Sequence, residues 1–428
     1  MPLNPFRIAP VATLLLLTAT GPAWAQSQIV STQIIQPTSE DSEATAGPHV
    51  SLNFGAAVAI SGRTAAIGIP HEVEEQAGPG PGRVGIYTKT EAGWVRSATL
   101  LPSNASDVRF GRDLDLCGNL LVVEAEKSTY VFRGRGAHWR EIQRIALSSP
   151  DKGLGTLVCG NDSFAQSVST LNDQGEPRGT VHVYEQRRGH DFERVAKLRA
   201  SDPNDSIGHS LAMERGILVA GSDPDGAYVF VRHGHRWIER QKLQSFGPNG
   251  AGIDAAVAIR DRIIIAGAPG VEVSAEPLAP APDGVAFVYL PYRNSWFESQ
   301  SLNNPPALPY LNSSGHFGAQ IAMGRHLAAV LVPRTNSDQI RHTSVVIVFD
   351  RLGEEFTLAR GVYGAGEESE IIPDIDMSGR RLILGREESR RFNSIIIGRV
   401  VILEFEASPA PVTQTDWEDA DRGEADEP

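Results

Sequence analysis

The sequence is organised by a short unit, first met at residues 53–70, that recurs with variation about every fifty residues. In this copy Ala57 and Ala59 alternate with larger apolar residues, Ser61-Gly62-Arg63 interrupts the alternation, and the pattern then resumes until Pro70. Alternation with a period of two indicates a strand, and a short Gly-containing break between two such runs indicates a tight turn. Each copy is therefore expected to form a β-hairpin.

The unit occurs seven times, and further strand-like runs follow each hairpin. The positions equivalent to Gly55 are 55, 111, 153, 208, 254, 318 and 372. In the third copy the pattern indicates only three strands, at 153–158, 180–184 and 192–198. Copies of this length, with Gly 42 and Pro 28 in the composition and almost no helical periodicity, favour an all-β repeat fold. We predict a seven-bladed β-propeller with four strands in a blade.

The seventh copy lacks its fourth strand. Its last strand-like run is 395–405, whereas residues 29–35 form an extra strand-like run near the amino terminus. Pairing 29–35 with 399–405 would complete the blade and close the ring, which removes exposed sheet edges. We therefore expect a propeller closed by an N-terminal strand.

The chain divides into four segments. Residues 1–25 contain Arg7, a short apolar run and the small-residue pattern Ala23-Trp24-Ala25, which are typical of a signal peptide cut after Ala25. This predicts a secreted or periplasmic protein. Residues 26–50 are expected to form the closing strand and a linker, residues 51–407 the propeller, and residues 408–428 a disordered acidic tail.

The formal net charge of −13 limits the possible partners. Nucleic acids and anionic membrane surfaces favour basic proteins, so neither is an expected partner. After the leader, no apolar run approaches the length of a membrane span, and no membrane insertion is expected. The composition leaves the oligomeric state open.

The chain contains two cysteines. Cys117 and Cys159 each precede Gly-Asn, so the sequence places them at matching turns of neighbouring blades. In an exported protein this position makes a disulfide possible. The alternative is two unbonded turn residues whose α-carbons lie beyond the roughly 7 Å that a disulfide can span.

Three residue pairs and one triplet resemble a known repeat. Phe54-Gly55, Phe110-Gly111, Phe317-Gly318 and Gly267-Ala268-Pro269 are similar to the two halves of the FG-GAP repeat, which forms the seven-bladed head of integrin α subunits. Segments 130–133 and 228–237 look still more like bacterial secreted members of that family. The resemblance covers nearly all of the chain after the leader and implies a secreted propeller.

In some members of that family a widened, Asp-rich hairpin turn holds calcium. Here the turns, such as Ser61-Gly62-Arg63, are too short to supply the several oxygen ligands that calcium needs. We therefore expect no metal and no cofactor.

Four aspartates share two repeat positions. Asp113 and Asp115 in the second copy correspond to Asp374 and Asp376 in the seventh, where most other copies have small residues. A period of two places each pair on one face of its strand, so we expect the four carboxylates to gather near one rim of the channel. They are ligand-binding candidates for a cation or a basic group. The alternative is that they are hydrated and bond to neighbouring amides or to Arg112, Arg380 or Arg381.

Other conspicuous residues have structural explanations. Trp94, Trp139, Trp237 and Trp296 open outer strands and are expected to pack between blades rather than to stack on sugars. The His233-Gly234-His235 spacing falls in a predicted turn. The loops 71–82, 270–282 and 303–316 are longer than blade geometry requires, which makes them the candidate binding surface.

These observations favour a secreted, non-enzymatic module that binds an unknown protein or glycan. No Gly-x-Ser-x-Gly, Cys-x-x-Cys or His-Glu-x-x-His motif occurs, and no catalytic residue is predicted. The main alternative is a propeller hydrolase or lyase using groups at the channel rim, such as Asp113, Asp115, Asp374 or His209. A further alternative is a structural envelope component.

Overall fold

The computed structural model describes most of the propeller. The described residues are 16–17, 27–38, 41, 50–51, 53–70, 72–73, 80–147, 152–171, 175, 177–187, 191–223, 226–234, 236–243, 256–272, 283–303, 316–335, 342–363, 370–389 and 396–406. The predicted acidic tail, and the predicted signal peptide apart from Leu16 and Leu17, lie outside this set. Within the described part of the chain, no helix is long and apolar enough to cross a membrane.

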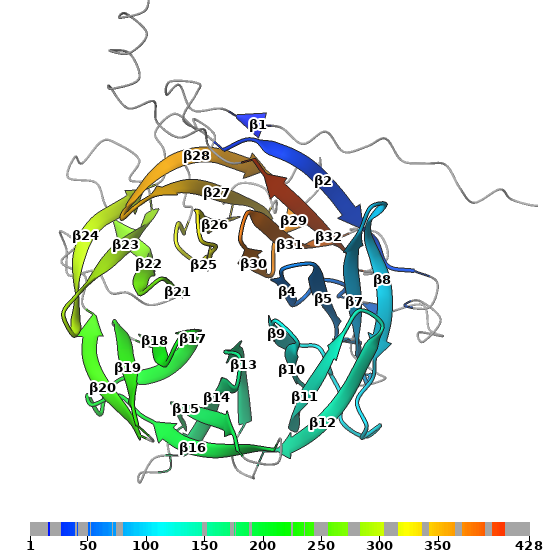
Figure 1. Ribbon diagram of the computed structural model, residues 1–428, viewed down its shortest axis with the longest axis horizontal. Coiled ribbons are helices and arrows are strands. Elements are labelled where there is room, and N and C mark those ends of the chain that lie inside the picture. Colours follow the sequence, from blue (N-terminus) through cyan, green and yellow to red (C-terminus); the bar gives the residue numbers. More distant parts are fainter. Residues whose placement is uncertain are drawn as a thin grey trace, which may run out of the picture.

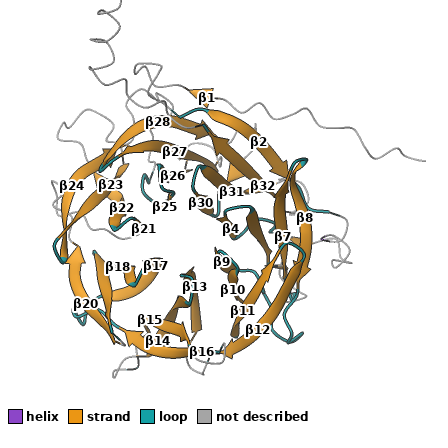
Figure 2. Cartoon of the chain, viewed as in Figure 1, coloured by secondary structure: helices purple, strands orange, loops and turns teal. Residues whose placement is uncertain are grey.

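Seven antiparallel sheets stand in a ring around a central channel (Figures 1 and 2), which confirms the predicted seven-bladed β-propeller. The innermost strand of each blade comes first in sequence, and the outermost comes last in blades 1 to 6. The strands are, in blade 1, β4 (Val58–Ser61), β5 (Thr64–Ile69), β7 (Arg83–Thr90) and β8 (Gly93–Leu100); in blade 2, β9 (Asp113–Cys117), β10 (Leu120–Glu124), β11 (Ser128–Arg135) and β12 (His138–Ala146); in blade 3, β13 (Lys152–Cys159), β14 (Ser163–Leu171), β15 (Pro177–Gln186) and β16 (Phe192–Leu198); in blade 4, β17 (Ser206–Glu214), β18 (Ile217–Asp223), β19 (Ala227–His233) and β20 (Arg236–Leu243).

The remaining blades follow the same order. Blade 5 comprises β21 (Val257–Arg260), β22 (Ile263–Glu272), β23 (Asp283–Tyr292) and β24 (Ser295–Asn303); blade 6 comprises β25 (Gln320–Met323), β26 (Leu327–Thr335), β27 (His342–Leu352) and β28 (Glu355–Tyr363); blade 7 comprises β30 (Ile375–Ser378), β31 (Arg381–Ser389), β32 (Ile396–Phe405) and β2 (Ile29–Ile35). Four two-residue strands, β1 (Leu16–Leu17), β3 (Val50–Ser51), β6 (Glu72–Val73) and β29 (Glu370–Ile371), add short pairings, and β29 links β27 to β31.

The blade order defines two ends of the ring. Since the strands are antiparallel, the turn between the first and second strands lies at the same end of a blade as the turn between the third and fourth. We call this end of the ring the turn face and the opposite end the loop face. The predicted binding loops 71–82, 270–282 and 303–316 connect strand ends on the loop face, although most of their residues lie outside the described set.

The ring is closed as the sequence predicts. Strand β2 pairs with β32 in an antiparallel register that runs from Ile29 opposite Phe405 to Ile35 opposite Val400. Ile35 is buried in a cluster that joins blade 7 to blade 1 and includes Phe54. The amino-terminal and carboxy-terminal ends of the repeats are therefore held in one sheet.

Blade 3 has the four strands that its sequence fails to indicate. Its second strand, β14, contains buried Gln166 and Ser167 beside Phe164 and Val168, so polar residues interrupt the apolar pattern. The glycine in the left-handed region is Gly155, with φ 75°, and not Gly153 as the repeat spacing predicts. Gly153 instead pairs with Val168 within the sheet, because the ladder between β13 and β14 shifts its register between residues 153 and 157.

The two halves of the repeat motif meet across blade junctions. Gly318 of blade 6 has a φ of 96°, and its carbonyl oxygen lies against the α-carbon of Gly267 in blade 5. A β-carbon at Gly267 would collide with that oxygen. The same contact joins Gly68 to Gly111 and Gly385 to Gly55. Glycine is required at both positions, since one needs a positive φ and the other a close backbone approach.

Glutamine side chains form a second junction device. The side-chain amide of Gln241 in blade 4 donates to the carbonyl oxygen of Trp296 in blade 5 at 2.7 Å and accepts its backbone N–H at 2.8 Å. The same paired contact joins Gln33 to Trp94, Gln143 to Phe192 and Gln300 to Phe356. The indole rings of Trp94 and Trp296 are buried, and those of Trp139 and Trp237 pack against core clusters. The outer-strand aromatics are thus packing residues.

Candidate functional site: the central channel

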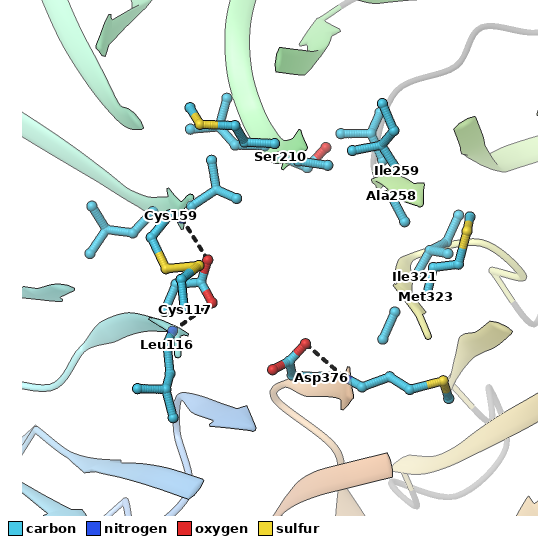
Figure 3. A pocket seen from close by; sticks show the side chains of 18 of the residues that line it. Leu116, Cys117, Cys159, Ser210, Ala258, Ile259, Ile321, Met323 and Asp376 are labelled. Carbon is cyan, nitrogen blue, oxygen red and sulfur yellow. Dashed lines mark hydrogen bonds between the residues drawn. A yellow bond between two sulfur atoms is a disulfide. The ribbon is translucent and has the colours of Figure 1, made fainter. Parts of the chain in front are cut away.

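A cavity of about 700 Å³ occupies the axis of the ring (Figure 3). All seven innermost strands, β4, β9, β13, β17, β21, β25 and β30, contribute to its wall. Much of the wall is aliphatic, with residues such as Ile60, Ala258, Ile259, Ile321 and Met323. The charged residues of the lining are the four predicted aspartates together with Glu214, Arg215 and Arg260.

The four predicted aspartates all line this cavity. Asp113 and Asp115 lie on β9, Asp376 lies on β30, and Asp374 directly precedes β30; these are the innermost strands of blades 2 and 7, which flank blade 1. Each is partly exposed, whereas the residues between them, Leu114 and Ile375, are buried. The period of two therefore turns the carboxylates toward the channel, and the expected gathering on one part of its wall is found.

Each carboxylate bridges two backbone amides. In blade 7, Asp374 accepts the N–H of Ile375 at 2.9 Å through one oxygen and the N–H of Val58 in blade 1 at 2.7 Å through the other. Asp376 does the same with Met377 and Ile60, at 2.6 and 2.7 Å. The first strand of a blade is a sheet edge, so those of its N–H groups that point away from the second strand have no partner in their own sheet. The aspartates supply that partner from the preceding blade.

Blade 2 repeats this arrangement toward blade 3. Asp113 accepts N–H groups of Leu114 and Leu157 at 2.9 and 2.6 Å, and Asp115 accepts those of Leu116 and Cys159 at 2.7 and 2.7 Å. The arginines that the sequence offered as partners bond elsewhere: Arg112 to the carbonyl oxygen of Gly153, Arg380 to Ser27 and Glu406, and Arg381 to Glu404 and Gly62.

The environment raises the pKa of all four aspartates. Although the side chains are partly exposed to the channel, desolvation of their carboxyl groups in its wall is the main cause for each. It is reinforced for Asp113 by the charges of Glu124 and Asp374, and for Asp115 by the charge of Asp376. The pKa of Asp115 is raised to about 7 and that of Asp374 to about 8. The N–H groups that each carboxylate accepts act in the opposite direction, because they stabilise the charged form.

A buried carboxylate next to the channel was missed by the sequence argument. Glu124 ends the apolar run of β10, is fully buried, and lies 3.8 Å from the guanidinium of Arg112. Burial raises its pKa to about 7, while Arg112 lowers it. The sequence does carry a signal for this residue, because Glu124 is an acid at the end of an otherwise apolar strand.

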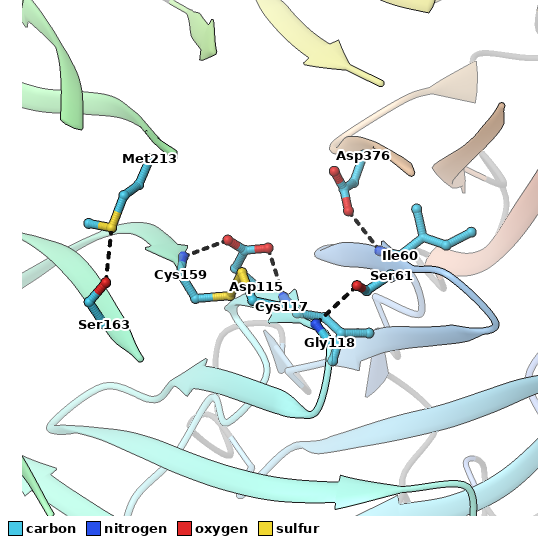
Figure 4. The surroundings of a disulfide bond; sticks show 10 residues. Ile60, Ser61, Asp115, Cys117, Gly118, Cys159, Ser163, Met213 and Asp376 are labelled. Atoms are coloured by element: carbon cyan, nitrogen blue, oxygen red, sulfur yellow. Dashed lines mark hydrogen bonds between the residues drawn. A yellow bond between two sulfur atoms is a disulfide. The ribbon is translucent and has the colours of Figure 1, made fainter. Parts of the chain in front are cut away.

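The two cysteines are joined across the channel wall (Figure 4). Cys117 of blade 2 and Cys159 of blade 3 form a disulfide with their α-carbons 5.9 Å apart. In the repeat, Cys117 corresponds to Ser61 of blade 1. Cys159 instead corresponds to Ile60, the residue before Ser61, because Asp115 accepts the N–H of Cys159 in the same way as Asp376 accepts the N–H of Ile60. The two cysteines are therefore offset by one residue in the repeat. This offset of one residue turns Cys159 back toward blade 2 and Cys117 forward toward blade 3.

The disulfide also determines whether the neighbouring side chains can bind a metal ion. Asp115, Cys117 and Cys159 bring one carboxylate oxygen and two sulfur atoms within 4.8 Å of one another. Metals bind thiolates, and both sulfurs here belong to the disulfide. This trio therefore offers a single carboxylate ligand, which is too few for a metal centre.

No family model matches the chain, and no curated protein matches it. Among solved structures, one chain of the S. cerevisiae core factor crystal structure is similar, with a TM-score of 0.46 and 11% identity over 98% of this chain and 66% of that one. One chain of an S. cerevisiae complex of a Dbp5 variant bound to Nup159, a Gle1 variant, IP6 and ADP has a TM-score of 0.46 and 10% identity over 90% of this chain and 98% of that one.

Proposed function

We propose that the chain is an exported, non-enzymatic binding module of the FG-GAP type, which recognises a protein or a glycan through the long loops of the loop face. The leader-like residues 1–25 support export. The paired contacts of Gly318 with Gly267 and of Gly111 with Gly68 give a structural reason for the Phe-Gly and Gly-Ala-Pro pattern. Loops on a rigid ring commonly carry recognition.

One observation carries the non-enzymatic part of the proposal. Both oxygens of each channel aspartate accept backbone N–H groups, one from the same strand and one from the next blade. A general base or nucleophile must present an oxygen to a substrate within hydrogen-bonding distance. These carboxylates are instead used to join blade 2 to blade 3 and blade 7 to blade 1.

Raised pKa values in a cavity also occur in active sites, so a channel hydrolase or lyase is the second candidate. The Asp113→Asn/Asp115→Asn variant, assayed on carbohydrate and peptide libraries, separates the two functions. A binding module shows no turnover in either form, whereas an enzyme shows turnover that the double substitution abolishes. The matched control is Asp162→Asn, which removes an exposed acid from the neighbouring hairpin turn.

Binding through the loops is tested by shortening them. Replacing residues 74–79, 273–282 and 304–315 one at a time with short Gly-Ser linkers leaves the strands at both ends intact. The purified variants are screened on glycan and protein arrays. We expect one replacement to remove a signal that the other two retain. A signal that survives all three replacements contradicts recognition through these loops.

A further inference from the structure

We infer that the turn face of blades 4 and 5 is a binding site for a polyanionic carbohydrate, a chain bearing sulfate or carboxylate groups. This surface lies opposite the long loops and does not depend on the function proposed above. It is built from Arg215 in the first turn of blade 4 and from Arg262 and Arg293 in the two turns of blade 5. Arg215 also lines the mouth of the channel.

The three arginines occupy backbone positions that disfavour them. Arg215, Arg262 and Arg293 have φ values of 46°, 66° and 54°. Hairpin turns that require a positive φ are normally built with Asn, Asp or Gly, because a long side chain is strained there. Strained positions of this kind cluster at functional sites. The backbone therefore supports a binding role for the guanidinium groups, and their charges are the main argument for it.

The acids that the structure describes around these arginines do not neutralise their charges. Glu214 forms an ion pair with Arg260 at 3.7 Å and accepts the backbone N–H of Arg262. Asp261 forms an ion pair with Arg351 at 2.9 Å. Arg262 donates to a neutral acceptor, the carbonyl oxygen of Arg293, at 3.2 Å. Among the described residues, none of Arg215, Arg262 and Arg293 forms an ion pair. Positioned guanidinium groups with uncompensated charge suit sulfate and carboxylate ligands.

Positive charge continues into the first turn of blade 6, whereas the second turn of that blade carries exposed Glu354 and Glu355. The pKa of His326 in the first turn is lowered by burial and then by the charges of Arg380, Arg325 and Arg351, and Asp261 acts in the opposite direction. Arg325 is exposed on the same turn. The chain as a whole has a net charge of −13, so a positive region on this face is a local exception. Such a region would attract an acidic ligand to this face.

Exposed aromatic rings favour a carbohydrate over a bare anion. Tyr292 and Phe297 are 57% and 49% exposed, with ring centroids 6.3 Å apart. Arg293 lies over the Tyr292 ring at 5.3 Å, so charge and apolar surface adjoin. Amphipathic rings of this kind contact ligands that combine apolar and polar surface. The hairpin is held in place by Arg240, which donates to the carbonyl oxygen of Asn294 at 2.6 Å.

The experiment compares binding of the purified chain to immobilised heparin, as a sulfated probe, and to polygalacturonate, as a carboxylated probe. Dextran is the uncharged reference. We expect binding to at least one acidic probe that weakens as salt rises. The variant Arg215→Asn/Arg262→Asn/Arg293→Asn should bind roughly tenfold more weakly, because three exposed ion pairs are lost. The control Arg194→Gln/Lys197→Gln/Arg199→Gln removes the same charge from exposed positions on the outer strand of blade 3 and just after it, and should bind within about twofold of the unmodified chain.

Thermal unfolding separates binding from folding. The three Asn substitutions should leave the midpoint unchanged or higher, since Asn tolerates a positive φ better than Arg does. The inference is overturned if the chain binds neither acidic probe, if both triple variants lose affinity equally, or if duplex DNA binds more tightly than either glycan. The last result would indicate a nucleic-acid site.

Discussion

Asp115 of blade 2 accepts the backbone N–H of Cys159 in blade 3 at 2.7 Å, beside the disulfide that joins the same two blades. A side-chain bond and a covalent bond thus hold one junction at the channel wall. The junction from blade 7 to blade 1 has no disulfide, and side-chain bonds from Asp374, Asp376 and Ser378 join its two innermost strands. The closing strand also completes blade 7 and contacts blade 1 at this junction. Of the four channel aspartates, Asp374 and Asp376 are therefore the ones whose loss should lower the free energy of unfolding most.

The first prediction concerns Asp376. Asp376→Ala leaves the N–H groups of Ile60 and Met377 without their acceptor and should lower the free energy of unfolding by about 1–3 kcal/mol. Urea unfolding at pH 6 measures the difference. Ser378→Ala is the matched control, because Ser378 accepts the N–H of Gly62 across the same junction at an exposed position. Its cost should stay below about 0.5 kcal/mol. Equal costs for the two variants would show that the channel carboxylates have no special role.

The second prediction is a fall in stability between about pH 5 and pH 8. The folded chain raises the pKa of Asp115 and Glu124 to about 7 and that of Asp374 to about 8, above the values of unfolded carboxylic acids. The folded state therefore binds more protons than the unfolded state in this range, so the stabilisation is complete at low pH and is lost as pH rises through the folded values.

Urea unfolding at several pH values tests this dependence. Asp374→Asn should flatten the slope, because an amide does not titrate. Asp41 and Glu404, whose pKa values are lowered by Arg96 and by Lys89 with Arg381, titrate below the window and should not contribute to the slope. His326, with its lowered pKa, acts in the opposite sense, so the series is repeated with His326→Asn. A free energy that rises from pH 5 to pH 8 in both backgrounds would contradict the prediction.

The fold could be predicted because its signals are local. Alternating strands such as Val58–Ser61 and Thr64–Ile69, with a glycine turn between them, specify a hairpin whatever its neighbours are. The closing pair of 29–35 with 399–405 followed from counting strands. The gathering of four aspartates followed from the repeat, since equal positions in a ring face the same axis.

Contacts between blades could not be predicted in the same way. The role of the aspartates depends on which N–H of the next blade faces them. The disulfide depends on the one-residue offset of Cys159, because the β13–β14 turn lies at residues 161–162, beyond Gly160, whose N–H bonds to the carbonyl oxygen of Ser163. The glutamine contacts did leave a signal. Trp139 and Gln143, Trp237 and Gln241, and Trp296 and Gln300 share a spacing of four residues. Each of these three glutamines bonds to the backbone of the next blade.

The third prediction concerns the disulfide. It joins residues 42 apart in sequence, so its loss should cost about 2–4 kcal/mol through the larger freedom of the unfolded chain. Cys117→Ser, Cys159→Ser and the double variant should have the same stability, because each change breaks the same bond. Denaturant unfolding of the three variants and of the chain in the presence of reductant measures this. A double variant much less stable than either single variant would mean that each cysteine contributes separately.

The last prediction tests closure by the N-terminal strand. Ile35 is 6% exposed and packs with Phe54 and Val400 where blade 7 meets blade 1, whereas Val30 on the same strand is 58% exposed. Ile35→Asp buries an unpaired carboxylate and should cost about 3 kcal/mol or more. Val30→Asp should change stability by less than about 0.5 kcal/mol. Because losing β2 exposes the edge of β32, the Ile35 variant should also aggregate as its concentration rises, which light scattering records. If both variants scatter alike, the strand is not what holds the ring shut.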